Sequence, residues 1–268
     1  MIDDSFYIKA YVKYRKEIKN INFLVKPISY KRFTLPTQIS GEWVVYCEML
    51  ENFSRQLVDD INQLRRYIIK LEAWSKVLFH YENEEEKIYL LLEFIEPLAI
   101  IALNLPYAIK NRFIFSLSHI CHQANRIKFP NWRDDLPEDQ FINLKIMDEK
   151  CKVWENYNNF KLHFLYIAND KFNKETSKFR HKFHHRIPVS VEFGLTGFIY
   201  REKYREKKQK KYRKKKQNSR VTYIIGETQP IPLNKLVNIL KDQYIKIVEC
   251  FKEYQNLVNE QLNEIFGT

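Results

Sequence analysis

Glycine is scarce in this chain of 268 residues. Five glycines occur, and none of them lies between positions 42 and 193. Glycine is the residue that most readily permits turns and irregular backbone, so a stretch of this length without it favours helix, with proline as the remaining helix breaker. We therefore expect a predominantly α-helical chain.

Cysteine is also sparse, and its spacing excludes two classes of small domain. The four cysteines, Cys47, Cys121, Cys151 and Cys250, are far apart and form no paired spacing. This pattern argues against a zinc module or a disulfide framework and fits a reducing compartment. The acidic start of the chain has no apolar run of the kind a signal peptide needs. We expect a cytoplasmic protein without metal or cofactor.

The signatures of several enzyme classes are missing as well. The sequence has no glycine-rich phosphate loop, no nucleophile elbow and no set of carboxylates spaced for magnesium. Its most apolar stretch, residues 89–109, contains two glutamates and two prolines. These residues are costly or disruptive in a spanning helix, so we interpret the stretch as a buried core helix and expect no membrane association.

Helical periodicity is what the chain has in abundance. Apolar residues recur every three or four positions, which predicts helices over about 40–79 and 233–265. A second helical region is expected over 85–127 with a break near Pro106. After a turn at 130–137, a long helix is expected over 138–187, ending before Pro188.

Residues 189–229 differ from the rest. Three short β-like runs bounded by glycine occur there, at 189–193, 197–200 and 220–225. The predicted fold is all-α: a helical bundle of long antiparallel helices with a small β-hairpin insertion that carries a polybasic loop. Residues 1–39 form an unassigned N-terminal segment, and residues 40–268 form the helical domain.

The positive charge is concentrated in that insertion. The formal net charge is +12, of which residues 201–220 supply +10 through twelve cations and two glutamates. Such a run attracts RNA or DNA, and its interleaved tyrosines can stack on unpaired bases. A solvated loop without a dedicated ligand is the alternative. The candidate nucleic-acid-binding residues in the run are Lys207, Lys208, Lys210, Lys211, Arg213, Lys214, Lys215 and Lys216.

The most informative segment precedes this run. Residues 178–186 contain three of the seven histidines and four cations. Histidine can take and give a proton near neutral pH, and arginine offers a fork of donors that suits phosphate, so the segment contains the groups for metal-free phosphodiester cleavage. A basic helix end that only holds an anionic partner is the alternative. The candidate catalytic residues are Arg180, His181, His184 and His185, and Lys182 and Arg186 are further candidates for nucleic-acid binding.

The spacing within this segment resembles that of the HEPN superfamily (higher eukaryotes and prokaryotes nucleotide-binding). Arg180 matches the family's arginine, His181 the polar residue after it, and His185 the histidine at the end of the motif. The resemblance implies a homodimer whose two motifs form a metal-independent ribonuclease site. In that site His185 is the acid–base group and Arg180 steadies the scissile phosphate of RNA.

The resemblance also implies a biological setting. Proteins of similar length and composition occur in bacterial defence and toxin systems, so an antitoxin or the product of a neighbouring gene is an expected partner, and tRNA or mRNA an expected target. Some HEPN domains are scaffolds or nucleotide-binding modules. A non-catalytic nucleic-acid-binding protein of the same fold is therefore the alternative function.

A second arginine and histidine group lies earlier in the chain. Arg112 and His119 are separated by two helical turns within an apolar helix, which indicates a structural pair. His119 and His122 are spaced so that they could bind a metal, but no carboxylate or second thiol lies at ligand spacing. We interpret them as a partly buried helix face, and the isolated His80 and His163 as packing or surface residues.

Overall fold

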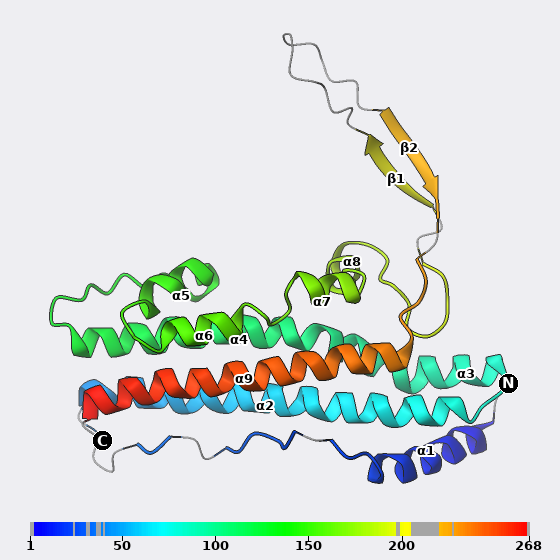
Figure 1. Cartoon of the computed structure of the whole chain (residues 1–268), viewed down its shortest axis with the longest axis horizontal. Helices are drawn as coiled ribbons and strands as arrows, with labels where there is room; N and C mark the ends of the chain where they lie inside the picture. The colour runs from blue at the N-terminus through cyan, green and yellow to red at the C-terminus, as the bar shows by residue number, and fades with distance from the viewer. Residues whose placement is uncertain are drawn as a thin grey trace.

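In the computed structural model the chain is predominantly helical, which confirms the all-α prediction (Figure 1). The structure describes residues 3–23, 25–30, 33–35, 39, 41–196, 199–204, 220–226 and 228–266. Three long helices carry most of the core. They are α2 (Gly41–Phe79), α4 (Glu96–Lys128) and α9 (Leu233–Phe266).

Helices α2 and α9 lie side by side and run in opposite directions. The Tyr46 hydroxyl donates a hydrogen bond of 2.9 Å to Gln261, and the hydroxyls of Ser54 and Tyr254 lie 3.1 Å apart. Moving forward along α2 therefore means moving backward along α9. All four side chains lie in the core, so their polar groups are paired with one another and not with water.

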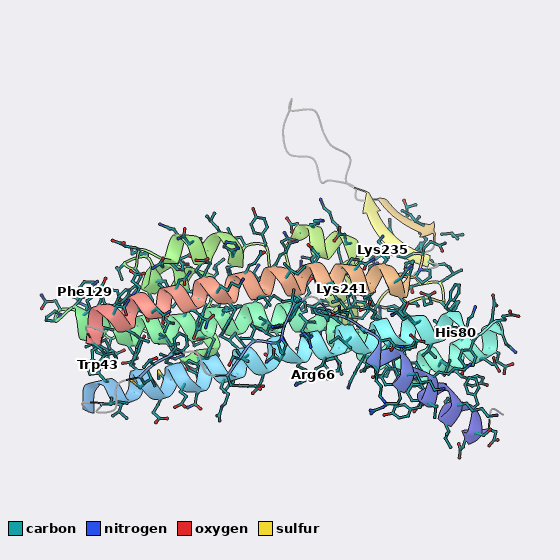
Figure 2. The ribbon with its side chains drawn as sticks, turned by 60° about the horizontal axis from the view of Figure 1, so that its bottom comes forward. Trp43, Arg66, His80, Phe129, Lys235 and Lys241 are labelled. Atoms are coloured by element: carbon teal, nitrogen blue, oxygen red, sulfur yellow. The ribbon has the colours of Figure 1, made fainter. Side chains whose placement is uncertain are left out.

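Helix α4 completes the core and runs in the same direction as α9. Ser116 contacts the Tyr254 hydroxyl at 3.1 Å, and Gln261 donates to the Cys121 sulfur at 3.1 Å. The Cys121 sulfur also lies 3.2 Å from that of Cys151. Figure 2 places Trp43, near the start of α2, and Phe129, just after α4, at the same end of the molecule.

Described parts of the N-terminal segment pack on this bundle. Its first part is helix α1 (Asp4–Lys19), which buries Ala10 and Tyr14 and stacks the Tyr14 ring on Trp74 with 4.6 Å between ring centroids. Further on, the Asn62 side chain forms two hydrogen bonds of 2.9 Å with the backbone of Ile28. Through these contacts, residues for which the sequence predicts no structure are held against one face of α2.

The predicted break near Pro106 is wrong, because α4 continues through it. Helix α3 (Glu84–Leu90) leads into a π-helix (Leu91–Ile95), and Pro97 then occupies the first turn of α4, where a missing N–H is tolerated. Pro106 is buried together with Ala102 and Ile109. The burial of this face offsets the roughly 3 kcal/mol that an interior proline costs.

The continuous helical stretch Glu84–Lys128 is long and apolar enough to cross a membrane by length and composition. One such stretch is weak evidence for a span, because core helices pass the same test. Here α4 contacts α2, α5 and α9, and Leu103, Phe113 and Leu117 lie buried between them. This packing fits the core-helix interpretation.

The single long helix predicted over 138–187 is also wrong. The chain there forms a series of short helices that cover one side of α4 and α9 (Figure 1). They are a 3-10 turn (Asp139–Phe141), α5 (Leu144–Cys151), α6 (Tyr157–Phe164), α7 (Asp170–Glu175) and α8 (Phe179–His185).

Local hydrogen bonds explain these interruptions. The Asn143 side chain accepts from the backbone N–H groups of the first turn of α5, and Asn169 does the same for α7. The Glu260 carboxylate of α9 accepts from two backbone N–H groups between α5 and α6, at 2.7 and 2.9 Å. Side chains that satisfy helix ends in this way stabilise several short helices over a continuous one.

Two strands extend away from the helices (Figure 1). Strands β1 (Ile199–Tyr204) and β2 (Arg220–Ile225) pair antiparallel, with Ile199 opposite Ile225 (Figure 1). Val191 makes a single bridge to Ile231 just before α9. Residues 205–219 between the strands lie outside the described residues, and so do the eight lysines and arginines predicted to bind nucleic acid between 207 and 216.

Candidate functional site

A surface hollow of about 610 Å³ lies where α4, α7 and α8 meet. All four residues predicted as catalytic line it, together with one side chain from α4 and one from α7. The lining residues are Tyr107, Asn173, Arg180, His181, His184 and His185. The structure thus brings the arginine and the three histidines of α8 to one solvent-accessible place.

The turn before α8 sets the direction of this helix. Ser177 and Lys178 both adopt left-handed backbone conformations, with φ of 52° and 57°. The Lys178 N–H donates to the Asn173 carbonyl at 2.6 Å, which closes the turn. Phe179 then enters the core, only 3% exposed. With Phe179 fixed inward, the next residue, Arg180, lies at the surface of α4.

Arg180 lies against an aromatic ring. Its guanidinium carbon is 4.6 Å from the centroid of the Tyr107 ring, and the Tyr107 hydroxyl donates a hydrogen bond to Asn173. Burial raises the pKa of Tyr107, and the charge of Arg180 offsets only part of that effect, so the phenol stays protonated and can donate. No carboxylate lines the hollow in the part of the chain that the structure describes.

The three histidines line the same hollow from exposed positions of α8. His181 and His185 are one helical turn apart, with 5.2 Å between ring centroids, and His184 and His185 are separated by 6.4 Å. Within the described ranges, no group of three side chains is arranged to hold a metal ion. The groups present can transfer protons and donate hydrogen bonds to an anion.

Lys182 and Arg186 are close in sequence to the four candidate catalytic residues, but they do not line the hollow. Partial burial lowers the pKa of Lys182, and the nearby charges of Arg186 and Lys178 lower it further. Arg186 is exposed and ends α8, where its N–H bonds the Lys182 carbonyl at 2.7 Å. These cations add positive charge beside the hollow without entering it.

Arg112 and His119, on α4, are paired with acids. Arg112 forms an ion pair with the nearly buried Asp60 of α2, and the His119 ring lies 3.2 Å from Asp139. Burial raises the pKa of Asp60, and the Arg112 charge opposes that effect. Burial lowers the pKa of His119, while Asp139 raises it in part. Both residues hold neighbouring elements together, as the sequence indicated.

His122 is enclosed in the same way. Its Nε2 atom lies 2.9 Å from Asp134, and the Trp132 indole N–H donates to its Nδ1 atom at 3.3 Å. Burial lowers the pKa of His122, with partial compensation by Asp134. Both ring nitrogens are occupied, so this imidazole has a structural role. The aspartates that pair with these histidines are far from ligand spacing in sequence, and the sequence alone did not reveal them.

Tyr107 and Asn173 are the site residues that sequence reasoning missed. They are 66 positions apart and come from different helices. Tyr107 follows a proline in an apolar stretch, and Asn173 lies in a segment expected to be uninterrupted helix. Only the folding of α7 and α8 onto α4 brings them to Arg180.

No family model, curated protein or solved structure matches this chain. We therefore infer a function from the geometry of the hollow and from the charge of the sequence.

Proposed function

We propose that the protein is a metal-independent endoribonuclease of HEPN type that acts as a toxin or phage-defence effector in the cytoplasm. The supporting observation is the hollow in which Arg180 and three histidines lie together without a lining carboxylate. The residue spacing of the HEPN motif adds support from the sequence. An active homodimer, with a composite site from two copies of α8, is part of the proposal.

The chemistry needs only the groups in the hollow. His185 takes the proton of a ribose 2′-hydroxyl, whose oxygen attacks the adjacent phosphorus. The bond from phosphorus to the 5′-oxygen breaks, and a protonated imidazole gives that oxygen its proton. Arg180 donates to the non-bridging oxygens, where negative charge increases in the transition state. The products are a 2′,3′-cyclic phosphate and a 5′-hydroxyl end.

The insertion at 189–229 is the proposed substrate guide. The antiparallel pairing of β1 and β2 supports a β-hairpin. The polybasic loop between the two strands would then lie at the tip of this hairpin. Contacts with phosphates depend strongly on salt, because each contact releases condensed counterions. RNA affinity should therefore fall steeply as salt concentration rises.

Cleavage of total RNA and tRNA in excess chelator tests the activity. The wild type is compared with Arg180→Ala, His185→Ala and a matched control, His163→Ala, which removes a partly exposed histidine of α6. Removal of an acid–base group should slow cleavage by about 10²–10⁴-fold, while the control keeps the wild-type rate. Undiminished cleavage by His185→Ala contradicts the proposal.

A non-catalytic nucleic-acid-binding protein of the same fold is the second candidate. The concentration of +10 charge in twenty residues favours it, because this charge alone can bind RNA. Replacing the eight cations between Lys207 and Lys216 with serine should then remove RNA binding. In this case the wild type shifts RNA on a gel without cleaving it, and substitution of His185 leaves binding unchanged.

A further inference from the structure

Tyr107 occupies a fixed point of the molecule. It belongs to α4, a helix of 33 residues, and its neighbours Pro106 and Ile109 are buried in the core. Its own ring is half-buried. A side chain anchored in this way has little freedom to move, in contrast to the exposed side chains of α8 around it.

Three contacts from two short helices converge on this ring. The ring centroid lies 5.6 Å from that of Phe172, the hydroxyl donates to the Asn173 side chain, and the Arg180 guanidinium carbon lies 4.6 Å from the ring. Asn173 also holds the turn before α8 through its carbonyl, which accepts from Lys178. Tyr107 and Asn173 thus connect the core helix, the turn and Arg180.

This contact holds Arg180 without neutralising it. A carboxylate would cancel the guanidinium charge and occupy its fork of donors. An aromatic face attracts the cation through its quadrupole and leaves the positive charge in place. No lining acid competes for Arg180 among the residues described. The guanidinium is therefore held in place while its charge stays available to an anion.

We propose that Tyr107, supported by Asn173, is the positioning residue that orients Arg180 toward the scissile phosphodiester of RNA. The assignment rests on the proposed function for the identity of the anion. Tyr107 acts through Arg180 and does not itself transfer a proton, because its hydroxyl is directed to Asn173.

The first test observes Arg180 directly. In arginine-labelled protein the side-chain N–H signal of Arg180, identified by its loss in Arg180→Lys, is expected to be displaced by the ring current of Tyr107. Tyr107→Phe retains the ring and keeps the displacement, whereas Tyr107→Leu fills similar space without a ring and loses it. A signal unchanged in Tyr107→Leu overturns the proposal.

The second test is a double-mutant cycle on RNA cleavage. Tyr107→Leu should lower kcat/KM by about tenfold and Tyr107→Phe by no more than about threefold, in line with the loss or retention of a cation–π contact. In the Arg180→Ala background Tyr107→Leu should cause no further loss, because Tyr107 acts through Arg180. A role in packing alone would give the same loss in both backgrounds, which contradicts the proposal.

Titration with inorganic phosphate separates this proposal from the nuclease assignment. Phosphate should shift the Arg180 signal of the wild type at lower concentrations than that of Tyr107→Leu. A wild type that never cleaves RNA removes the nuclease assignment, yet this difference in phosphate response still supports the positioning of Arg180. Identical phosphate responses in the two proteins overturn it, whether or not RNA is cleaved.

Discussion

The molecule contains two groups of arginine and histidine that face different surroundings. We name Arg112, His119 and His122 the α4 set, and Arg180, His181, His184 and His185 the α8 set. Each member of the α4 set lies within ion-pair distance of an aspartate, and its histidines are largely enclosed. The α8 set lines an accessible hollow without a lining acid in the described chain. The two sets share residue types, so an acidic partner distinguishes them, and exposure distinguishes their histidines.

This difference indicates what each set can do. A histidine whose ring nitrogens are bonded to an aspartate and an indole has no free position for a ligand, and its contribution is to stability. An exposed histidine beside an uncompensated guanidinium can meet an anion from solution. We therefore expect substitutions in the α4 set to change the free energy of unfolding, and those in the α8 set to change binding and catalysis.

The largest expected effect on stability is that of Arg112→Ala. It leaves the Asp60 carboxylate, whose side chain is 9% exposed, without its partner. Because Arg112 is itself half-exposed, we expect a loss of about 2–3 kcal/mol, somewhat below the roughly 3–5 kcal/mol of a fully buried pair that loses one partner. Arg180→Ala should cost less than about 1 kcal/mol. Urea denaturation of both variants measures the difference, and equal losses contradict the comparison.

Asn173→Asp should make the α8 set resemble the α4 set. The new carboxylate can still accept from Tyr107, but it also attracts and neutralises Arg180. We expect RNA affinity, measured by fluorescence anisotropy at fixed salt, to fall by about tenfold, or roughly 1.4 kcal/mol. Asn173→Ala is the control, because it removes the hydrogen bond without adding charge. A loss in Asn173→Ala as large as in Asn173→Asp would show that charge is not the cause.

The α4 set should also give stability a dependence on pH. Burial lowers the folded-state pKa values of His119 and His122, so the unfolded chain binds more protons in mildly acidic solution. This contribution is complete above the unfolded value of about 6.5 and decreases as pH falls below it, by at most about 1.4 kcal/mol per pH unit for each histidine. His122→Gln should flatten the profile between about pH 6.5 and 5.5, as measured by chemical denaturation. An unchanged slope contradicts the assignment.

The smallest effect concerns the helix that leads to α8. Asn169→Ala removes the side chain that accepts from the Phe172 N–H at the start of α7, and we expect a loss of about 1 kcal/mol. Lys171→Ala, which removes an exposed ion pair with Glu175, serves as the control and should change stability by less than about 0.5 kcal/mol. Thermal unfolding compares them, and similar melting temperatures would exclude a capping role for Asn169.

The long helices were predictable because their information is local and repeated. Apolar residues every three or four positions define α2 and α9 to within a residue or so of their observed bounds. The positions at which a helix continues or is interrupted were not predictable by the same reasoning. Pro106 is tolerated because its helix face is buried, and the interruptions after residue 138 depend partly on Glu260, more than 100 positions away.

The candidate site likewise contains residues that the sequence could identify and residues that it could not. The α8 set lies within six consecutive residues, so the sequence alone shows that its members are close together. Other partners come from segments that are close together only after folding. They are Tyr107 and Asn173 in the hollow, and the aspartates that pair with the α4 set. A sequence shows which groups are available, whereas their partners and exposure follow from tertiary packing.

The shortness of α8 has a consequence for how the site persists in time. The helix has seven residues, too few to be stable alone, and its one buried side chain is Phe179 at its first position. Such a segment can open locally while the bundle remains folded, so its backbone amides should exchange with deuterium before those of α4 and α9. On warming, α8 should therefore unfold, and the hollow be lost, at a lower temperature than that at which the bundle unfolds. An anion bound to Arg180 should slow amide exchange in α8 more than in α4 or α9.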